Sequence, residues 1–204
     1  MATETVISGA VEGPVDEAVL KRLIQELGAM PGPIYGKRGK DRLVQQVAAY
    51  SHAARLAPWV VLMDLDRDAD CAPTLRNRLL PDPAPALCLR IAVRAVEAWL
   101  LADRERFAEY FGIALSKVPP QAEALPDPKR AVVDLARSSR RKDIRRDLVP
   151  RQESGRTVGP AYTSHLLAYI QDVQNGWRPG IAAEGAESLK RALRCLERLL
   201  QRSA

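Results

Sequence analysis

Three carboxylates follow apolar stretches of this sequence and are the side chains best placed to do chemistry. Glu12 follows residues 5–11, and Asp64 and Asp66 follow residues 60–63. Both stretches are short and apolar and end at polar residues, which predicts buried strands. In an open parallel sheet, ligands bind in the crevice beyond the C-terminal ends of the strands. We therefore expect the three carboxylates to converge there.

The chemistry expected of such a cluster is the binding of a hard cation. Alternate residues of an extended chain point to the same side, so Asp64 and Asp66 are expected to face one ion. Oxygen-only ligands favour Mg²⁺ or Mn²⁺ over zinc. Asp68 lies in the same acidic run and is a further candidate metal ligand.

The acidic run DLDRDAD at residues 64–70 has other interpretations. An EF-hand loop is excluded, because Ala69 and Leu75 stand where that loop needs Gly and Glu. A phosphatase that forms an aspartyl-phosphate also carries two aspartates after a strand, but would have Thr or Val in place of Asp68. A glycosyltransferase motif, which the chain's other features do not favour, and an acidic loop that caps the next helix stay open.

A basic loop precedes the second predicted helix. Its sequence, GPIYGKRGK, lacks the GxxxxGK[ST] spacing of a Walker phosphate loop, so nucleotide hydrolysis by that route is not expected. Lys37, Arg38 and Lys40 are candidates to contact a phosphate backbone, or simply keep the loop soluble. His52 and His165 lie outside these motifs and are predicted to be surface or packing residues.

The elements that must position these side chains alternate between strand and helix. The sequence predicts strands at 5–11, 60–63 and 87–93, helices at 16–27, 40–56, 73–80 and 95–110, and a loop at 30–39. This alternation predicts an α/β fold with a mainly parallel sheet flanked by helices. Further helices are predicted at 129–147, 160–174 and 184–202. We therefore expect an α/β core over residues 1–112 and a basic helical extension, packed on the core, over residues 113–204.

The net charge of +6 is concentrated in residues 129–156, which contain ten basic and four acidic residues. Such a tract favours a polyanionic partner, nucleic acid first, although a solvated basic helix pair without a partner would have the same composition. The candidate nucleic-acid contacts are Lys37, Lys40, Lys129, Arg130, Arg140, Arg141 and Lys142.

Composition excludes several classes of protein. Among the 204 residues, 47% are hydrophobic and 27% charged, as in ordinary folded proteins and unlike disordered ones. No apolar run is long enough to span a bilayer, and the first residues do not resemble a signal peptide. Cys71, Cys88 and Cys195 show no CxxC spacing, so we expect buried thiols in a reducing cytoplasm rather than a disulfide framework or a zinc site.

Several sequence blocks occur together in an order that resembles a known family. They are VEGPVDEAVLKRLI (11–24), GKRGKDRLV (36–44), VVLMDLDRDAD (60–70), RIAVRAVEAWLLAD (90–103), DPKR (127–130), VGPAY (158–162) and W…SLKRAL (177–193). Glu-Gly after one strand and Asp-Leu-Asp after another resemble the Toprim core of topoisomerases, bacterial primases, recombination-repair proteins and overcoming-lysogenization-defect (OLD) nucleases. The whole set is similar to a small bacterial family of uncharacterised Toprim-like proteins.

The resemblance implies a Toprim-like fold with Mg²⁺ held by Glu12, Asp64 and Asp66. Related proteins often occur beside an ABC-type ATPase in bacterial anti-phage modules, where the Toprim partner is the presumed nuclease. The resemblance therefore implies a Mg²⁺-dependent phosphodiesterase acting on DNA or RNA, in which these three carboxylates are catalytic. Glu12 would bind the ion or serve as general acid and base.

Two positions depart from the family pattern. Val15 stands where Thr is expected, and Ala95 stands where an acid is expected. The second departure leaves Glu97 as the only acid of the RIAVRAVEAWLL stretch at residues 90–101. Glu97 would either hold a second cation, so that two ions clamp the reacting oxygens of a phosphodiester, or pair in the interior with Arg90 or Arg94.

Two other functions remain open at this point. The chain could be a non-catalytic, metal-binding Toprim subunit that partners an ATPase or binds a polyanion. It could also be a phosphotransferase or a hydrolase of small phosphomonoesters. One fold hosts many chemistries, so the resemblance supports the fold more strongly than the activity.

Overall fold

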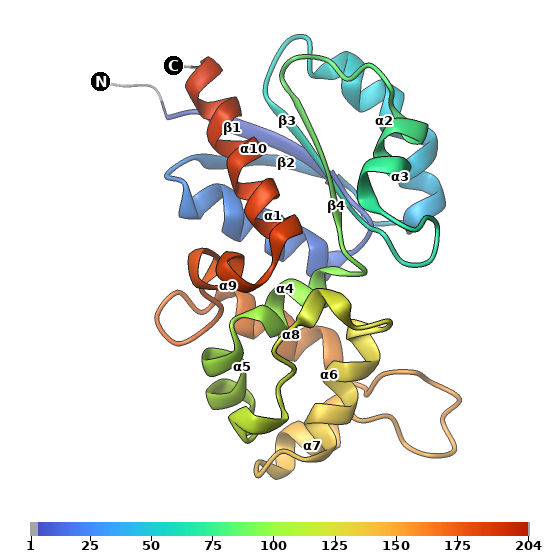
Figure 1. Ribbon diagram of the computed structural model, residues 1–204, viewed down its shortest axis with the longest axis vertical. Helices are drawn as coiled ribbons and strands as arrows, with labels where there is room; N and C mark the ends of the chain where they lie inside the picture. The colour runs from blue at the N-terminus through green and yellow to red at the C-terminus, as the bar shows by residue number, and fades with distance from the viewer. Residues whose placement is uncertain (1–3, 204) are drawn as a thin grey trace. The chain divides into compact units, whose positions relative to one another are not determined.

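The computed structural model describes residues 4–203 and divides them into two compact units (Figure 1). The first unit contains the described residues up to Val93 and those from Ser188 onward, and the second contains Arg94–Glu187. This division differs from the predicted boundary at residue 112. The helices just before that boundary belong to the second unit, and the C-terminal helix belongs to the first.

The first unit is built on a parallel sheet of β1 (Val6–Val11), β2 (Met30–Gly36), β3 (Trp59–Asp64) and β4 (Leu87–Ala92), in the order β2-β1-β3-β4. Helices connect successive strands: α1 (Pro14–Glu26), α2 (Lys40–Ala53) and α3 (Ala72–Leu79). The C-terminal helix α10 (Glu187–Ser203) completes the unit. The predicted α/β fold, with a parallel sheet flanked by helices, is confirmed.

Strand β2 corrects the prediction of a loop at residues 30–39. Its sequence, MPGPIYG, contains Pro31 and Pro33, which normally argue against a strand because proline has no N–H to donate. β2 lies at the edge of the sheet and pairs only with β1, so its other side needs no hydrogen-bond donors. The edge position is what makes these prolines tolerable.

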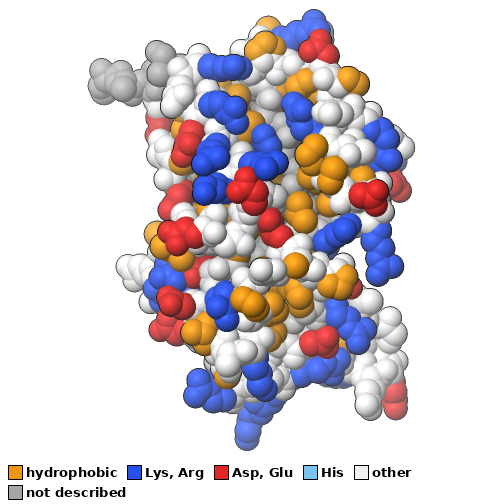
Figure 2. Space-filling view, viewed as in Figure 1, with side chains coloured by type: hydrophobic (Ala, Val, Ile, Leu, Met, Phe, Trp, Pro, Cys, Tyr) orange, Lys and Arg blue, Asp and Glu red, His pale blue; other side chains and the backbone are white. Residues whose placement is uncertain are grey.

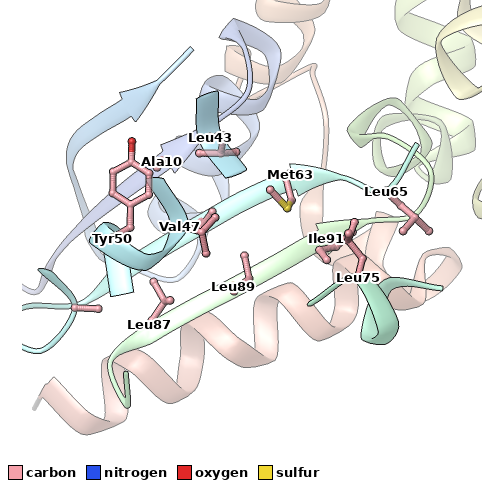
Figure 3. Close-up of a cluster of buried hydrophobic side chains, with 12 residues drawn as sticks. Ala10, Leu43, Val47, Tyr50, Met63, Leu65, Leu75, Leu87, Leu89 and Ile91 are labelled. Atoms are coloured by element: carbon pink, nitrogen blue, oxygen red, sulfur yellow. The ribbon is translucent and has the colours of Figure 1, made fainter. Parts of the chain in front are cut away.

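Helices cover both faces of the sheet. One core cluster lies between the sheet and helices α2 and α3, where Leu87, Leu89 and Ile91 of β4 meet Leu43 of α2 and Leu75 of α3 (Figure 3). Helices α1 and α10 lie on the opposite face (Figure 1). Because successive side chains of a strand alternate between faces, the even-numbered positions of β4 point toward α10.

A disulfide joins Cys88 of β4 to Cys195 of α10. The prediction of unpaired, buried thiols was therefore wrong for these two residues, and Cys71 is an exposed rather than a buried thiol. The two bonded residues are 107 positions apart. Local spacing carries no sign of this pair, because only the return of α10 to the sheet brings its cysteine beside β4.

The second unit is helical and contains α4 (Val96–Ala102), α5 (Arg104–Phe111), α6 (Pro128–Arg137), α7 (Lys142–Leu148), α8 (Tyr162–Gln171) and α9 (Pro179–Gly185). The helix predicted at 129–147 is interrupted between α6 and α7. There the Ser139 hydroxyl donates to Phe111 O at 2.6 Å, and Arg140 N donates to Gly112 O at 2.8 Å. These bonds to a remote segment replace the bonds that would have continued the helix.

Polar contacts between remote segments hold the second unit together. The Trp177 indole donates to Trp99 O at 3.1 Å. The carboxylate of Asp103, only 1% exposed, accepts from Arg178 Nε at 2.9 Å and Arg178 Nη2 at 2.6 Å. Trp99 is itself fully buried, so its ring belongs to the core of the second unit.

In the part of the chain that the structure describes, no helix combines the length and the hydropathy needed to cross a bilayer.

Candidate active site

The sheet has a topological switch between β1 and β3. The chain leaves β1 toward β2 on one side, and β3 then pairs with the other side of β1. In open α/β sheets this change of direction opens a crevice at the C-terminal ends of the two strands. Glu12 directly follows β1, and Asp64 is the last residue of β3. Both acids therefore lie where such sheets bind ligands.

The structure brings Glu12 and Asp64 into direct contact. The Asp64 N–H donates to Glu12 Oε1 at 2.8 Å, across 52 residues of sequence. Asp64 itself is buried, with an exposed fraction of 2%. A glutamate and an aspartate are thus held together in a poorly hydrated position.

This environment disfavours the charge on Glu12. The pKa of Glu12 is raised to about 7, chiefly by burial, while the hydrogen bond from the Asp64 amide lowers it. The nearby charges of Asp64 and Asp66 raise it further, whereas the Lys40 ammonium lowers it. Glu12 therefore titrates near neutral pH, which is the range that suits a general acid or base.

Lys40 also belongs to the site, although its contact with the carboxylates was not predicted from the sequence. Its Nζ donates to Asp64 O at 2.6 Å and contacts Asp66 Oδ2 at 2.9 Å and Asp68 Oδ2 at 2.6 Å. Burial lowers the pKa of Lys40, but the hydrogen bonds to Asp68 and Asp66 outweigh this, so the pKa is raised. Lys40 was predicted to contact a phosphate backbone; the structure places its ammonium among the carboxylates.

The loop between β2 and α2 directs Lys40 into the site. Lys37 N donates to Val11 O at 2.9 Å, and Gly39 N donates to Glu12 O at 3.1 Å. Gly36 has a φ of 86°, and a Cβ there would lie 2.2 Å from Val11 O, so only glycine fits. The GKRGK segment thus joins the end of β2 to the residues around Glu12. In the sequence, the closely spaced basic residues of this segment were the signal that could have drawn attention to Lys40.

The strand alternation expected for Asp64 and Asp66 does not hold. β3 ends at Asp64, and Asp66 has a left-handed backbone with a φ of 48°. Asp66 and Asp68 reach Lys40 from a turn, with side chains 47% and 43% exposed. A turn, rather than an extended strand, therefore brings these two carboxylates to the site.

Glu12, Asp64, Asp66 and Asp68 offer only oxygen atoms, which are the donors that hard cations prefer. Three oxygen atoms of these residues already hold a positive charge, the ammonium of Lys40. Within residues 4–203, however, no group of three or more His, Cys, Asp and Glu side chains is arranged as a metal site. The donor chemistry fits Mg²⁺ or Mn²⁺, with Lys40 holding two of the candidate carboxylates.

The other predicted metal candidate, Glu97, lies in α4 of the second unit. It is 1% exposed, and its Oε1 accepts a hydrogen bond from the Tyr162 hydroxyl at 3.2 Å. The alternative pairing of Glu97 with Arg90 or Arg94 stays a prediction. A second cation at Glu97 stays a prediction.

The basic tract of residues 129–156 also lies in the second unit. Arg130 Nε lies 3.5 Å from Asp134 Oδ2, and Arg141 Nη2 lies 2.6 Å from Asp143 Oδ2. Ion pairs within the tract thus neutralise part of its charge. The other candidate contacts there are the exposed residues Lys129, Arg140 and Lys142.

Both histidines lie outside the carboxylate site. His52 is an exposed residue of α2. His165 Nε2 lies 3.1 Å from Asp147 Oδ2. The hydrogen bonds from Arg146 and then His165 lower the pKa of Asp147 to about 2. This pair links α7 to α8.

The pH dependence of stability offers a test of the Glu12 environment. Because its pKa is raised in the folded state, the folded protein binds the proton more tightly than the unfolded chain between about pH 4.5 and pH 7. Glu12 therefore destabilises the fold progressively as the pH rises through that window. Glu12→Gln should leave stability near pH 4 unchanged and raise it by about 2 kcal/mol at pH 8, measured by urea unfolding in EDTA.

Glu153→Gln, which alters an exposed loop residue, is the matched control and should have no such pH-dependent effect. An equal gain in both variants, or a loss of stability in Glu12→Gln at pH 8, would contradict the described environment of Glu12.

Comparisons of the chain with models of protein families, with curated proteins and with solved structures found no match.

Proposed function

We propose that the protein is a Mg²⁺- or Mn²⁺-dependent phosphodiesterase that cleaves DNA or RNA through the site at Glu12, Asp64 and Asp66. One observation carries this proposal: at the switch point of a parallel sheet the Glu12 carboxylate accepts a hydrogen bond from the backbone amide of Asp64, and Glu12 has a pKa of about 7. The order of sequence blocks that resembles the Toprim-like proteins supports the same activity.

Each side chain has a role that follows from its position. Buried Asp64 and turn-borne Asp66 would hold the cation, with Asp68 as a further ligand. Glu12, close to neutral pKa, can hold a proton or release it at Oε2 while its Oε1 stays bonded to the Asp64 amide. Lys40 would neutralise carboxylate charge before the cation binds and then turn toward a phosphate oxygen.

A bound divalent cation would supply Lewis-acid stabilisation of the charge that develops on the phosphodiester oxygens. Exposed basic residues of the first unit, such as Lys37, would neutralise the phosphate backbone of the substrate, and the basic residues of the second unit, such as Arg140, are further candidates for nucleic-acid contacts. An ion pair with Glu17 at 3.2 Å offsets part of the charge of Lys37 in the absence of substrate.

The direct test is cleavage of four substrates by the purified chain. Single- and double-stranded DNA and RNA are incubated with the EDTA-treated protein while Mg²⁺ or Mn²⁺ is titrated in, and a chromogenic phosphomonoester is included to detect a phosphatase. Metal-dependent cleavage of at least one nucleic acid is expected. Phosphate release from the monoester without nucleic-acid cleavage would instead favour a small-molecule phosphatase.

A second function is favoured by the ion pairs of Lys40. An ammonium that already neutralises Asp66 and Asp68 stabilises the carboxylate turn without any metal. The protein would then be a non-catalytic Toprim-type subunit that binds a polyanion or an ABC-type ATPase. Absence of hydrolysis with both metals, together with binding of an ATPase that is lost in Asp66→Asn, would support this function over the nuclease.

A further inference from the structure

Helix α10 lies along β4, on the face of the sheet opposite the cluster formed with α2 and α3 (Figure 3). Three contacts define its course: Ser188 with Val93, Cys195 with Cys88, and Arg202 with Pro85. Along these three contacts the residue numbers of α10 rise while those in and around β4 fall, so the helix runs antiparallel to β4. The residues of β4 that face α10 are therefore placed beside known turns of the helix.

Arg90 is a charged residue on this inner face of β4. It lies two positions after Cys88 and so points toward the same side, roughly 7 Å further along the strand. The side chain is half-buried, and its Nε is buried with no hydrogen-bond partner among the described residues. A strand position normally filled by an apolar side chain thus carries a guanidinium.

The charged groups around Arg90 are arginines. Burial, and then the charges of Arg76, Arg198 and Arg191, lower the pKa of Arg90 to about 10. Arg90 is still protonated at neutral pH. No carboxylate appears among the described groups that shift it, so its positive charge is opposed rather than compensated by its neighbours.

Two elements, α3 and α10, supply the surrounding arginines. Arg191 and Arg198 lie four residues before and three residues after Cys195, which puts them on the helix face that carries the disulfide. Arg76 comes from α3, which packs against the edge strand β4. Arg76 Nη1 donates to Asn77 Oδ1 and Arg198 Nε donates to Arg194 O, both neutral acceptors. Figure 2 shows Lys and Arg side chains gathered along α10 on this side of the molecule.

We propose that Arg76, Arg90, Arg191 and Arg198 form a binding site for a phosphate group. A phosphate oxyanion would give the buried Nε of Arg90 an acceptor and would offset the repulsion that the neighbouring arginines exert on the charge of Arg90. Planar guanidinium groups match phosphate oxygens with paired hydrogen bonds, which makes arginine the usual residue for this ligand. The phosphate is either free or part of a nucleic-acid backbone. This site does not depend on the carboxylates of the proposed nuclease.

Calorimetric titration in EDTA at constant ionic strength tests the site. The probes are inorganic phosphate and a short single-stranded DNA oligonucleotide, with acetate as the anion control. Arg90→Met should weaken phosphate binding by about tenfold or more, because it removes a charged hydrogen-bond donor. Arg55→Gln, the loss of one exposed charge elsewhere in the first unit, should change it by less than about twofold.

A second variant guards against an indirect effect of changing a residue inside the sheet. Arg191→Gln with Arg198→Gln alters only exposed positions of α10 and should also weaken phosphate binding about tenfold or more. If these variants lose binding of both probes, the ligand is a phosphodiester. If they lose binding of inorganic phosphate but still bind the oligonucleotide, the ligand is a free phosphate. Equal binding of acetate and phosphate by the parent, or unchanged phosphate binding in both variants, would overturn the proposal.

Because no divalent metal is present in this titration, its failure would leave the cleavage prediction for Asp64 and Asp66 untouched. Conversely, variants of Asp64 and Asp66 that lose cleavage should still bind phosphate at Arg90. The two outcomes are therefore separable.

Discussion

Asp64→Asn is expected to lower Mg²⁺-dependent cleavage of nucleic acid by about 10³-fold or more. The substitution keeps the size of a side chain that is buried beside Glu12 but removes its negative charge. A metal ligand contributes several kcal/mol to the stabilisation of charge in the transition state, and each 1.4 kcal/mol corresponds to roughly tenfold in rate. Asp66→Asn should have a loss of similar size, measured as initial cleavage rate at saturating Mg²⁺.

The matched control is Asp82→Asn, which changes an exposed aspartate in the turn before β4 and should cleave at the parental rate. Circular dichroism and urea unfolding establish that the site variants remain folded. Parental cleavage by the double variant Asp64→Asn/Asp66→Asn would show that these carboxylates do not carry the reaction.

Reduction of the Cys88–Cys195 disulfide should lower the free energy of unfolding by about 3–5 kcal/mol. The bond closes a loop of 107 residues that includes the whole second unit, and a loop of roughly that length loses a large conformational entropy when it is cross-linked in the unfolded chain. Urea unfolding of the first unit, followed with and without a thiol reductant, measures this difference. The same loss should appear in Cys195→Ala without reductant.

Cys71→Ser tests whether the effect belongs to the bond. This cysteine is exposed and free, so its substitution should leave the stability and its response to reductant unchanged. If Cys195→Ala unfolds at the parental urea concentration under oxidising conditions, the cross-link does not stabilise the fold.

Local sequence pattern was enough to place the candidate carboxylates. The apolar runs before Glu12 and Asp64 predict strands, and strands joined by helices must run parallel in one sheet. Parallel strands end at a common edge, so two acids that each follow a strand end at that edge. That Glu12 and Asp64 lie at the same edge of the sheet was therefore predictable from residue types and spacing, whereas the hydrogen bond from the Asp64 amide to Glu12 was not.

Edge and turn geometry lay beyond that pattern. The two prolines of β2 predict a loop when only the sequence is considered. They are compatible with a strand because β2 lies at the edge of the sheet, where one side of the strand needs no N–H donors. The left-handed backbone of Asp66 likewise ended the alternation that an extended chain would have continued. Both features depend on where the sheet stops rather than on the residues themselves.

Tertiary structure also decided which remote charges and thiols meet. The ammonium of Lys40 reaches the Asp66 carboxylate because the β2–α2 loop is bonded to the end of β1. Cys195 reaches Cys88 because the chain comes back to the first unit at α10, after the residues of the second unit. Sequence periodicity reports the face on which a side chain lies, within one element. It carries no distance between elements, so the charge balance around Glu12, the disulfide and the arginines around Arg90 were set only when the chain packed.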